Sequence, residues 1–432
     1  MGATMSAPNE LWPKPPASEV FRGLACKVVE VVDTEAAPIS LLIHFFVAIG
    51  NIFGRGPYCK LGGSKHFCNL YAIVCGDSSK ARKGTAWAQI REIIKSVDEN
   101  WYSQCVKSGL SSGEGLVYQI RDSVDSGEGK YDPGISDKRI LVSDTEFAAT
   151  LRNLRREGNI LSTVMRDMWD GQPLGTMTKS SLAKCQEPHG SLIGHITLFE
   201  LKSELRSVEI SNGFANRMLW VCVRRAKILP EGSDFNIHKL DEVIRRLKEV
   251  VQFAKSVGEM SKDTDASSLW YEIYTILSES EDNAFGGVTS RAEAQVMRLA
   301  CIYALLDLSP IIKREHLVSA KALWDYCENS CRFLFGNFDS MTNKLLEALK
   351  EAPQGLTRTN IRDLFNKNSD KDSINRALKC LKDASLAWCR HERTSGPKSV
   401  ERWFYGLRPY DNDDIQTNGR AGREDVGDFA SQ

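Results

Sequence analysis

The stretch from Gly76 to Thr85 has the residue types and spacing of a loop that binds phosphate. An apolar run at 70–75 leads directly into it, and a helical pattern follows at 86–95. Backbone N–H groups in such a loop, together with the positive end of the following helix, attract a polyanion. A lysine adds charge at the β- and γ-phosphates, and a hydroxyl helps to hold Mg²⁺. The predicted nucleotide-binding residues are Gly76, Ser78, Ser79, Arg82, Lys83, Gly84 and Thr85, with Thr85 also a metal ligand.

This loop departs from the common phosphate-loop pattern GxxxxGK[ST]. It is longer, Ala81 and Arg82 stand where glycine would precede lysine, and Gly84 separates Lys83 from Thr85. The pattern therefore leaves open whether Arg82 or Lys83 contacts phosphate. An ordinary surface turn is the alternative interpretation.

Acidic residues elsewhere supply the remaining chemistry. The run RILVSD ends in Asp144, and Glu146 follows. A carboxylate at a strand end beside a phosphate loop can bind Mg²⁺, usually through water; the alternative is a strand that ends in an acidic turn. Glu114 lies in a Gly/Ser-rich turn and could deprotonate an attacking water, although a solvated loop glutamate fits equally well. Asp144 and Glu146 are the predicted metal ligands, and Glu114 is a predicted catalytic residue.

Alternating strands and helices are needed to position these residues. Short runs rich in apolar residues lie at 70–75, 139–144, 190–197 and 217–223, and they lack the strict alternation of a half-exposed strand. Such runs fit strands buried on both faces. The helical patterns between them predict an α/β fold with a largely parallel sheet. Two helices are expected before it, at 19–32 and 38–53.

The pattern changes after residue 230, where apolar positions recur at helical spacing. Residues 341–406 then have the order helix, turn, helix, helix and hairpin, which is typical of a winged-helix domain. The expected organisation is an extended leader at 1–18, an α/β core with N-terminal helices at 19–230, a helical domain at 231–338, a winged-helix domain at 339–408 and a disordered tail at 409–432.

The predicted winged helix has a local excess of basic residues, although the whole chain has 56 basic and 56 acidic residues. Arg376, Lys379 and Lys382 recur at every third position of its third helix, and Arg393 lies in the hairpin. A helix for a groove and a basic hairpin for the backbone are features of DNA-binding modules. These four residues are the predicted DNA contacts; a protein-binding adaptor is the alternative.

Composition and cysteine usage restrict the class of protein. The formal charge is +0, so no overall field directs the chain to nucleic acid or to a membrane surface. Twelve cysteines are scattered without a CxxC pair, which indicates reduced thiols rather than disulfides or a zinc site. The most apolar stretch, 39–49, is far shorter than a membrane span, and a signal-peptide pattern is missing. We expect a cytoplasmic protein without membrane contact.

Taken together, these segments resemble a family of RecA-like P-loop ATPases from plasmid, phage and prophage replication genes. That family is similar to RepA-type and DnaB-like hexameric replicative helicases. The resemblance covers about residues 10–340 and rests on motifs in a shared order. The motifs are Trp12-Pro13, Thr34-Glu35-Ala36, Gly76…Arg82-Lys83-Gly84-Thr85, Ser112-Gly113-Glu114-Gly115, Asp144-Thr145-Glu146-Phe147-Ala148, Ile193-Gly194-His195-Ile196-Thr197, Asn212…Arg217 and Arg224-Arg225…Pro230.

The resemblance implies a RecA-like core and an ATP- and Mg²⁺-dependent DNA helicase or translocase, acting as a homo-oligomeric ring in replication of a mobile element. Single-stranded DNA would contact the core, duplex DNA or its backbone would contact the winged helix, and a primase would be a partner. Two other functions stay open: a nucleotide-controlled DNA-binding initiator or regulator without unwinding, and a defence or signalling ATPase.

The resemblance also implies a role for each site residue. Lys83 and Thr85 would bind phosphate and Mg²⁺, Glu114 would be the catalytic carboxylate, and Asp144 with Glu146 would be the Walker B acid. His195 would be the γ-phosphate sensor. Arg217 would be the arginine finger, with Arg224 and Arg225 as rivals.

Overall fold

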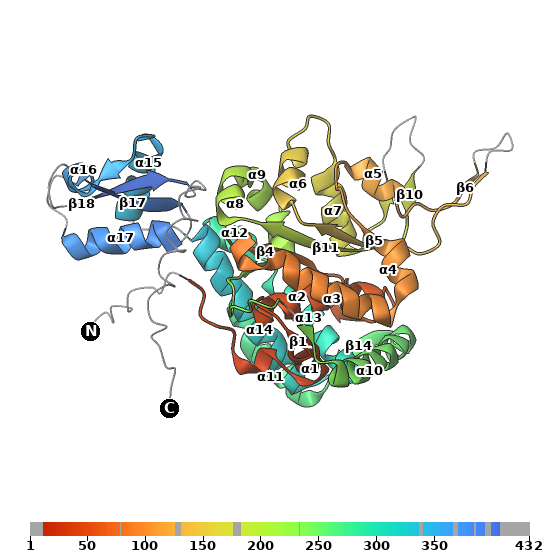
Figure 1. The fold of residues 1–432 in the computed structure, drawn as a ribbon. Helices are drawn as coiled ribbons and strands as arrows, with labels where there is room; N and C mark the ends of the chain where they lie inside the picture. The colour runs from red at the N-terminus through yellow and green to blue at the C-terminus, as the bar shows by residue number, and fades with distance from the viewer. Residues whose placement is uncertain are drawn as a thin grey trace, which may run out of the picture. The chain divides into compact units, whose positions relative to one another are not determined.

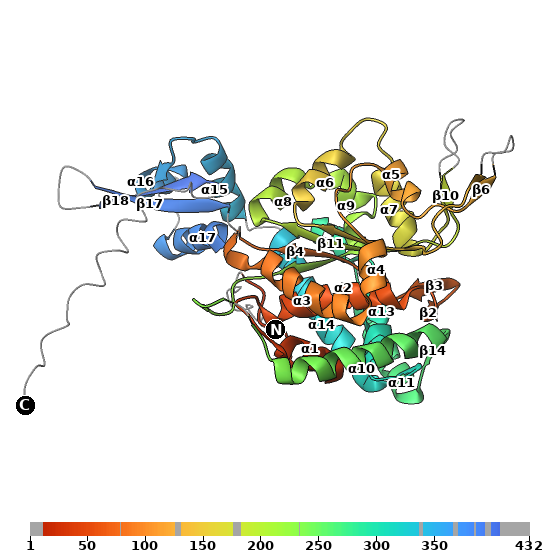
Figure 2. The ribbon, with the colours of Figure 1, turned by 45° about the vertical axis from the view of Figure 1, so that its right-hand side comes forward.

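The computed structural model describes residues 12–77, 79–125, 131–175, 183–232, 234–336, 340–365, 370–383, 386–393 and 399–406. The chain divides into two compact units, Met1–Asn337 and Phe338–Gln432. The first unit contains a parallel sheet with helices on both faces, and the second contains helices and a small antiparallel sheet (Figure 1 and Figure 2).

A five-stranded parallel sheet forms the centre of the first unit, in the order β12-β4-β11-β8-β5. Four of its strands are those predicted from the apolar runs, and their bounds differ from the prediction by one residue or less at either end. The predicted α/β class with a parallel sheet is therefore confirmed. The strands are β4 (Tyr71–Cys75), β5 (Val106–Lys107), β8 (Arg139–Asp144), β11 (His189–Ile196) and β12 (Met218–Cys222).

Alternate residues of these strands belong to two separate cores. In β4, Ala72 and Val74 pack in one core, whereas Ile73 and Cys75 pack in the other. Burial on both faces explains why the strand sequences are continuously apolar. The first core includes α1 (Gly23–Glu30), α2 (Pro38–Phe53), α3 (Lys83–Val97), α4 (Glu99–Cys105), α10 (Ile237–Ser256), α11 (Thr264–Leu277), α13 (Ala292–Leu306) and most of α14 (Arg314–Phe335). The second includes α5 (Gly113–Tyr118), α6 (Phe147–Leu154), α7 (Leu161–Asp170), α8 (Leu198–Glu204), part of α9 (Ser207–Ser211) and α12 (Ala284–Thr289).

Helix α2 runs through the first core and is buried along nearly its whole length. Pro38 occupies its first turn, where the missing N–H costs nothing, and every residue from Ile39 to Phe53 is buried. The apolar stretch 39–49 is therefore a core helix, as predicted, with His44 in its middle. Within the described ranges, no helix has both the length and the apolar character that a membrane crossing requires.

The section 231–338 was predicted to be a separate, all-helical domain, and this is wrong. It lies inside the first unit, and its helices α10, α11 and α13 share a core with α2 and α3. It also contributes β14 (Glu259–Lys262), which pairs in parallel with β2 (Tyr58–Leu61). Only Met260 of β14 is buried, so the strand is too short for its alternation to be visible in the sequence. The second sheet has the order β15-β14-β2-β3, with β3 (Ser64–Phe67) and β15 (Ile311–Ile312).

Three two-stranded ladders and three short 3-10 helices complete the description of the first unit. The ladders are β1 (Val32–Asp33) with β13 (Asp234–Phe235), β6 (Val124–Asp125) with β7 (Tyr131–Asp132), and β9 (Leu174–Gly175) with β10 (Lys184–Cys185). The 3-10 helices are η1 (Ser18–Val20), η2 (Ser79–Ala81) and η3 (Ala215–Arg217). The cysteines are free thiols, and all but Cys26 and Cys389 are buried, which agrees with the predicted absence of disulfides.

The second unit has the predicted order of three helices and a hairpin. Its elements are α15 (Ser340–Lys350), β16 (Leu356–Thr357), α16 (Arg358–Leu364), α17 (Lys371–Asp383), β17 (Ala387–Arg393) and β18 (Ser399–Tyr405). The strands form an antiparallel sheet in the order β16-β18-β17. The hairpin turn at 394–398, the leader up to residue 11 and the predicted tail lie outside the described residues.

Candidate functional site

The carboxyl ends of β4, β8 and β11 lie in register at one edge of the central sheet. Cys75 of β4 is opposite Ile196 of β11, and Asp144 of β8 is opposite Gly194. β4 continues into α3 in the first core, whereas its neighbour β11 continues into α8 in the second core. Adjacent parallel strands whose connections leave toward opposite faces open a crevice at their carboxyl ends, where α/β proteins bind ligands. This edge is the candidate site.

The loop that follows β4 begins at a position where only glycine fits. A Cβ on Gly76 would lie 2.4 Å from the carbonyl oxygen of Val223 and 2.8 Å from the Cβ of Ala81. The Gly76 N–H donates to the carbonyl of Ile196 over 3.2 Å. The loop is therefore fastened to the ends of both neighbouring strands. Ser78 lies outside the described residues, and of Ser79 only the backbone is described.

Lys83, the first residue of α3, carries a buried ammonium group inside this loop. Its side chain is 9% exposed, and Nζ donates to the carbonyls of Gly76 over 2.7 Å and Asp77 over 3.0 Å. Burial lowers the pKa of Lys83, and this shift is opposed by Cys75 and by the negative charges of Asp77, Glu200 and Glu146, in that order. Among the described carboxylates none lies within ion-pair distance of Nζ. The loop therefore holds a desolvated positive charge that an anion would complement.

Arg82 is directed elsewhere. Its backbone is left-handed, with φ of 56°, and its Nε lies 2.5 Å from Oε2 of Glu35. Glu35 also pairs with Arg225 over 3.5 Å and accepts from the backbone N–H of Leu229 over 3.1 Å. The Leu229 hydrogen bond, followed by the charges of the two arginines, holds the pKa of Glu35 below its usual value. Of the two basic residues, only Lys83 therefore has its charged group inside the loop.

The N-terminal end of α3 follows directly on this loop. Among the described side chains none caps the helix, and the Ala86 N–H is bonded to the carbonyl of Arg82. The N–H groups of Lys83, Gly84 and Thr85 are therefore those that the helix itself leaves without partners. An added Cβ at Gly84 would meet no atom within 4 Å, and Thr85 is half-buried. Partial positive charge at such an end favours anions.

Asp144 ends β8 at the same edge as Lys83. Its carboxylate is 9% exposed and accepts hydrogen bonds from the hydroxyl of Thr150 and, over 3.2 Å, from the N–H of Glu146. Glu146 is exposed at the start of α6, and its charge acts on Lys83. Lys83, Asp144 and Glu146, predicted from separate segments, are therefore brought to one side of the molecule.

Glu114 is less closely placed. It lies in the first turn of α5, seven residues beyond the end of β5 rather than at the strand end that the resemblance implied. Its side chain is exposed and has no hydrogen-bond or ion-pair partner within the described part of the chain. The preceding segment does reach the site, because the carbonyl of Leu110 accepts from Asn153 over 3.0 Å and from Thr150, the residue that also holds Asp144.

His195 lies one residue before the end of β11, and its side chain faces the first core. It is 4% exposed, and its Nε2 lies 2.8 Å from Nε2 of His44 in α2. Burial, followed by the charges of His44 and Lys83, holds the pKa of His195 well below its usual value. The imidazole is therefore neutral and is within electrostatic range of Lys83.

Arg217 is at the opposite edge of the sheet, because it precedes the first residue of β12. The residue is buried, with its side chain 8% exposed, and Nη2 pairs with Asp170 over 2.6 Å. The structure does not bring Arg217 to Lys83. Of its two rivals, Arg224 lies 3.7 Å over the ring of Trp12, and Arg225 pairs with Glu35.

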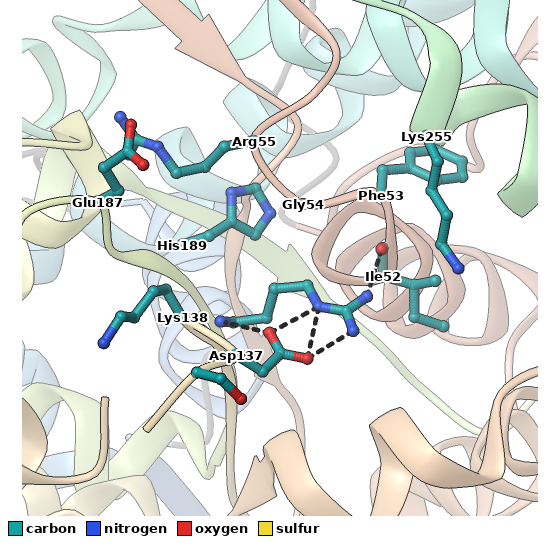
Figure 3. Close-up of a pocket in the computed structure, with 11 residues that line it drawn as sticks. Ile52, Phe53, Gly54, Arg55, Asp137, Lys138, Glu187, His189 and Lys255 are labelled. Carbon is teal, nitrogen blue, oxygen red and sulfur yellow. Dashed lines mark hydrogen bonds and ion pairs between the residues drawn. The ribbon is translucent and has the colours of Figure 1, made fainter. Parts of the chain in front are cut away.

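A cavity of about 320 Å³ also lies away from the candidate site (Figure 3). Its lining includes Arg139 and His189, the first residues of β8 and β11. Asp137, which is labelled in Figure 3, forms an ion pair with Arg139, with 2.6 Å between Nη2 and Oδ2. Since the two ends of parallel strands lie at opposite sheet edges, this cavity is separate from the Lys83 loop.

In the second unit, the predicted basic face of α17 is exposed. Arg376, Lys379 and Lys382 are exposed, while Ile374, Ala377, Leu378 and Leu381 are buried. The side chain of Arg393 lies outside the described residues. Two arginines of the neighbouring hairpin share one carboxylate, because Arg390 and Arg402 both pair with Glu392, over 2.6 and 2.9 Å. The helix therefore offers more unpaired positive charge than the hairpin.

The sequence assigned no role in the site to three residues that organise this edge: Glu35, which belongs to one of the resemblance motifs, His44 and Thr150. A histidine inside the apolar run 39–49 was the clearest signal, because a buried imidazole needs a hydrogen-bond partner. Glu35 and Thr150 gave no such signal, since their partners are distant in sequence or lie in another element.

Comparisons with known proteins identify no relative. No protein-family model matches the sequence, and no curated protein matches it.

Within the described ranges there is no group of three or more His, Cys, Asp or Glu side chains arranged to hold a metal ion.

Proposed function

We propose that the protein is an ATP- and Mg²⁺-dependent DNA helicase or translocase with a RecA-like core. The observation that carries this proposal is the ammonium group of Lys83, which is buried in a glycine-anchored loop without an ion-pair partner among the described residues. It stands at the start of an uncapped helix, at the sheet edge that also holds Asp144. This arrangement fits the terminal phosphates of a nucleotide.

In this proposal, Lys83 and the first-turn N–H groups of Lys83, Gly84 and Thr85 bind the β- and γ-phosphates. The phosphate charge would offset the burial that now lowers the pKa of Lys83. The ammonium would exchange its two carbonyl partners for phosphate oxygens, which are stronger acceptors.

Asp144 and Thr85 are the residues that would hold Mg²⁺. Magnesium is usually bound by one or two carboxylates together with phosphate oxygens and water. The donor set fits this need, because Thr150 and the Glu146 N–H fix the Asp144 carboxylate in one orientation. When bound, the ion neutralises charge on the transferred phosphoryl group.

Glu114 and the arginine finger complete the proposed catalytic set. Glu114 is exposed and unpaired within the described residues, so it is free to accept a proton from an attacking water. A finger acts on the nucleotide of a neighbouring subunit, and head-to-tail rings bring different surfaces of two copies together. The location of Arg217 at the edge opposite Lys83 fits such a ring, provided that its guanidinium leaves Asp170.

The second unit is the proposed DNA-binding module, with α17 as its winged-helix recognition element. Three exposed basic side chains on one helix face, above buried apolar residues, suit phosphate contacts along a groove. Single-stranded DNA would contact the core.

The test is ATP hydrolysis with and without single-stranded DNA. We expect DNA to stimulate hydrolysis in the wild type and Lys83→Ala to abolish it. Lys80→Ala is the matched control, because Lys80 is an exposed lysine of the same loop. Glu114→Gln should bind ATP and fail to hydrolyse it. Equal hydrolysis in Lys83→Ala and Lys80→Ala would overturn the proposal.

The exposed basic face of α17 also favours a second candidate, a nucleotide-controlled DNA-binding initiator without unwinding activity. A forked duplex with a labelled strand distinguishes the two functions. ATP-dependent release of the strand supports the helicase, whereas tight ATP-dependent duplex binding without release supports the initiator.

A further inference from the structure

Two buried histidines form a hydrogen-bonded pair next to the candidate site. His44 of α2 is fully buried and His195 of β11 is 4% exposed. Their Nε2 atoms are 2.8 Å apart, with the ring centroids separated by 5.0 Å and the planes at 86°. Trp87 of α3 stacks on His44 with its centroid 5.9 Å away. Both rings are therefore held by packing on elements that surround the loop.

The hydrogen bonds determine which nitrogens carry protons. Nδ1 of His44 lies 2.5 Å from the carbonyl oxygen of Ser40, which can only accept, so this Nδ1 is protonated. Burial lowers the pKa of His44 to about 4, so the ring is neutral at neutral pH and its Nε2 is an acceptor. The proton between the two Nε2 atoms therefore belongs to His195. Since His195 is also neutral, its Nδ1 has no proton.

His195 is located where this tautomer matters for the nucleotide. The next residue, Ile196, accepts the hydrogen bond from Gly76 that anchors the loop, and the charge of Lys83 acts on His195. We propose that His44 is a positioning residue that fixes His195 as the Nε2–H tautomer, so that His195 offers a hydrogen-bond acceptor, Nδ1. This inference rests on the proposed function of the site.

The consequence concerns what His195 does beside a bound phosphate. A neutral imidazole with bare Nδ1 and occupied Nε2 has no donor for a phosphate oxygen. It can accept a hydrogen bond from a water molecule and so orient it. His44 acts only through His195, because its own two nitrogens are already bonded to Ser40 and His195.

The first experiment reads the tautomer directly. Long-range nitrogen–proton correlation spectra of protein with labelled histidine distinguish the two neutral forms. The His195 signal, assigned by its loss in His195→Gln, is expected to show the Nε2–H form in the wild type. His189 is an internal reference, because its Nε2 bonds the carbonyl of Gly50 over 3.1 Å and fixes the same form independently of His44. An Nδ1–H form of His195 in the wild type overturns the proposal without any variant.

The second experiment uses a matched pair of variants. His44→Gln keeps an acceptor for the His195 N–H, whereas His44→Leu removes it. We expect His44→Leu to yield mixed tautomers and a roughly ten- to hundredfold lower kcat for ATP hydrolysis with little change in KM, as for loss of an orienting partner. His44→Gln should restore both readouts. Equal kcat in His44→Leu and wild type would overturn the role.

Failure of the proposed function is distinguishable from failure of this inference. If the wild type hydrolyses no ATP, the ATPase proposal fails while the spectra still report the tautomer. If hydrolysis occurs and His195 has the other tautomer, only the inference about His44 fails.

Discussion

Replacing Lys83 by methionine separates a binding role from a structural one. Methionine keeps the length and apolar stem of lysine and removes the charge. In the unliganded protein, burial lowers the pKa of Lys83, so the charged form is less favourable there than in water. The variant loses two hydrogen bonds of a charged donor, of about 1.5–3 kcal/mol each, and it also loses a desolvation cost of several kcal/mol. We expect these opposing terms to change the free energy of unfolding by less than about 2 kcal/mol.

Nucleotide binding should respond very differently. Loss of one charge-assisted contact to phosphate costs about 1.5–3 kcal/mol, which corresponds to roughly 10- to 150-fold weaker binding. Urea unfolding gives the stability, and calorimetric titration with ATP gives the affinity. Lys80→Met, an exposed change in the same loop, should leave both unchanged. A Lys83→Met protein that is strongly destabilised yet binds ATP normally would refute the reasoning, because Lys83 would then be a structural residue.

Three further outcomes are expected. Asp144→Asn should retain ATP binding within a few-fold but lose Mg²⁺-dependent hydrolysis. The amide keeps the shape of the carboxylate but not its charge, and it can accept only one of the two hydrogen bonds that Asp144 now accepts. Filter binding measures ATP binding, and phosphate release measures hydrolysis. Alanine at Arg376, Lys379 and Lys382 together should make the slope of log affinity for DNA against log salt less negative by about 0.9 per lost phosphate contact. The free energy of unfolding should fall by roughly 3 kcal/mol through His44 as the pH falls from about 6.5 to about 4. Between these pH values His44 is protonated in the unfolded state but not in the folded state. Urea midpoints measured across this pH range test the prediction.

Each of these three predictions would be contradicted by a specific result. Normal hydrolysis in Asp144→Asn would remove this carboxylate from the metal site. An unchanged salt dependence in the triple variant would place DNA elsewhere than on α17. If the urea midpoint of His44→Gln depends on pH as strongly as that of the wild type, other groups cause the pH dependence. His189 is then the first candidate, because burial lowers its pKa to about 3.

Local sequence patterns determined much of the architecture. The four longer strands of the central sheet, the buried helix α2 and the helices of the second unit follow from periodicity and composition, which depend on neighbouring residues in the chain. The candidate loop was also visible, because glycine, lysine and a hydroxyl residue lie within ten positions of each other. Even its ambiguity was local, since both Arg82 and Lys83 satisfied the pattern.

Tertiary structure alone decided which side chains meet. Arg82 is assigned to Glu35, His195 to His44 and Asp144 to Thr150 by the order of the strands and by the faces that their helices cover. The parallel direction of β12 places Arg217 at the edge opposite Lys83, and a second sheet joins β14 to β2. A sequence encodes hydrogen-bonding capacity residue by residue, whereas the partner depends on which distant segments are packed side by side. Pairing between strands that are distant in the sequence determines which partner each residue meets. A short stretch of adjacent residues does not contain that information.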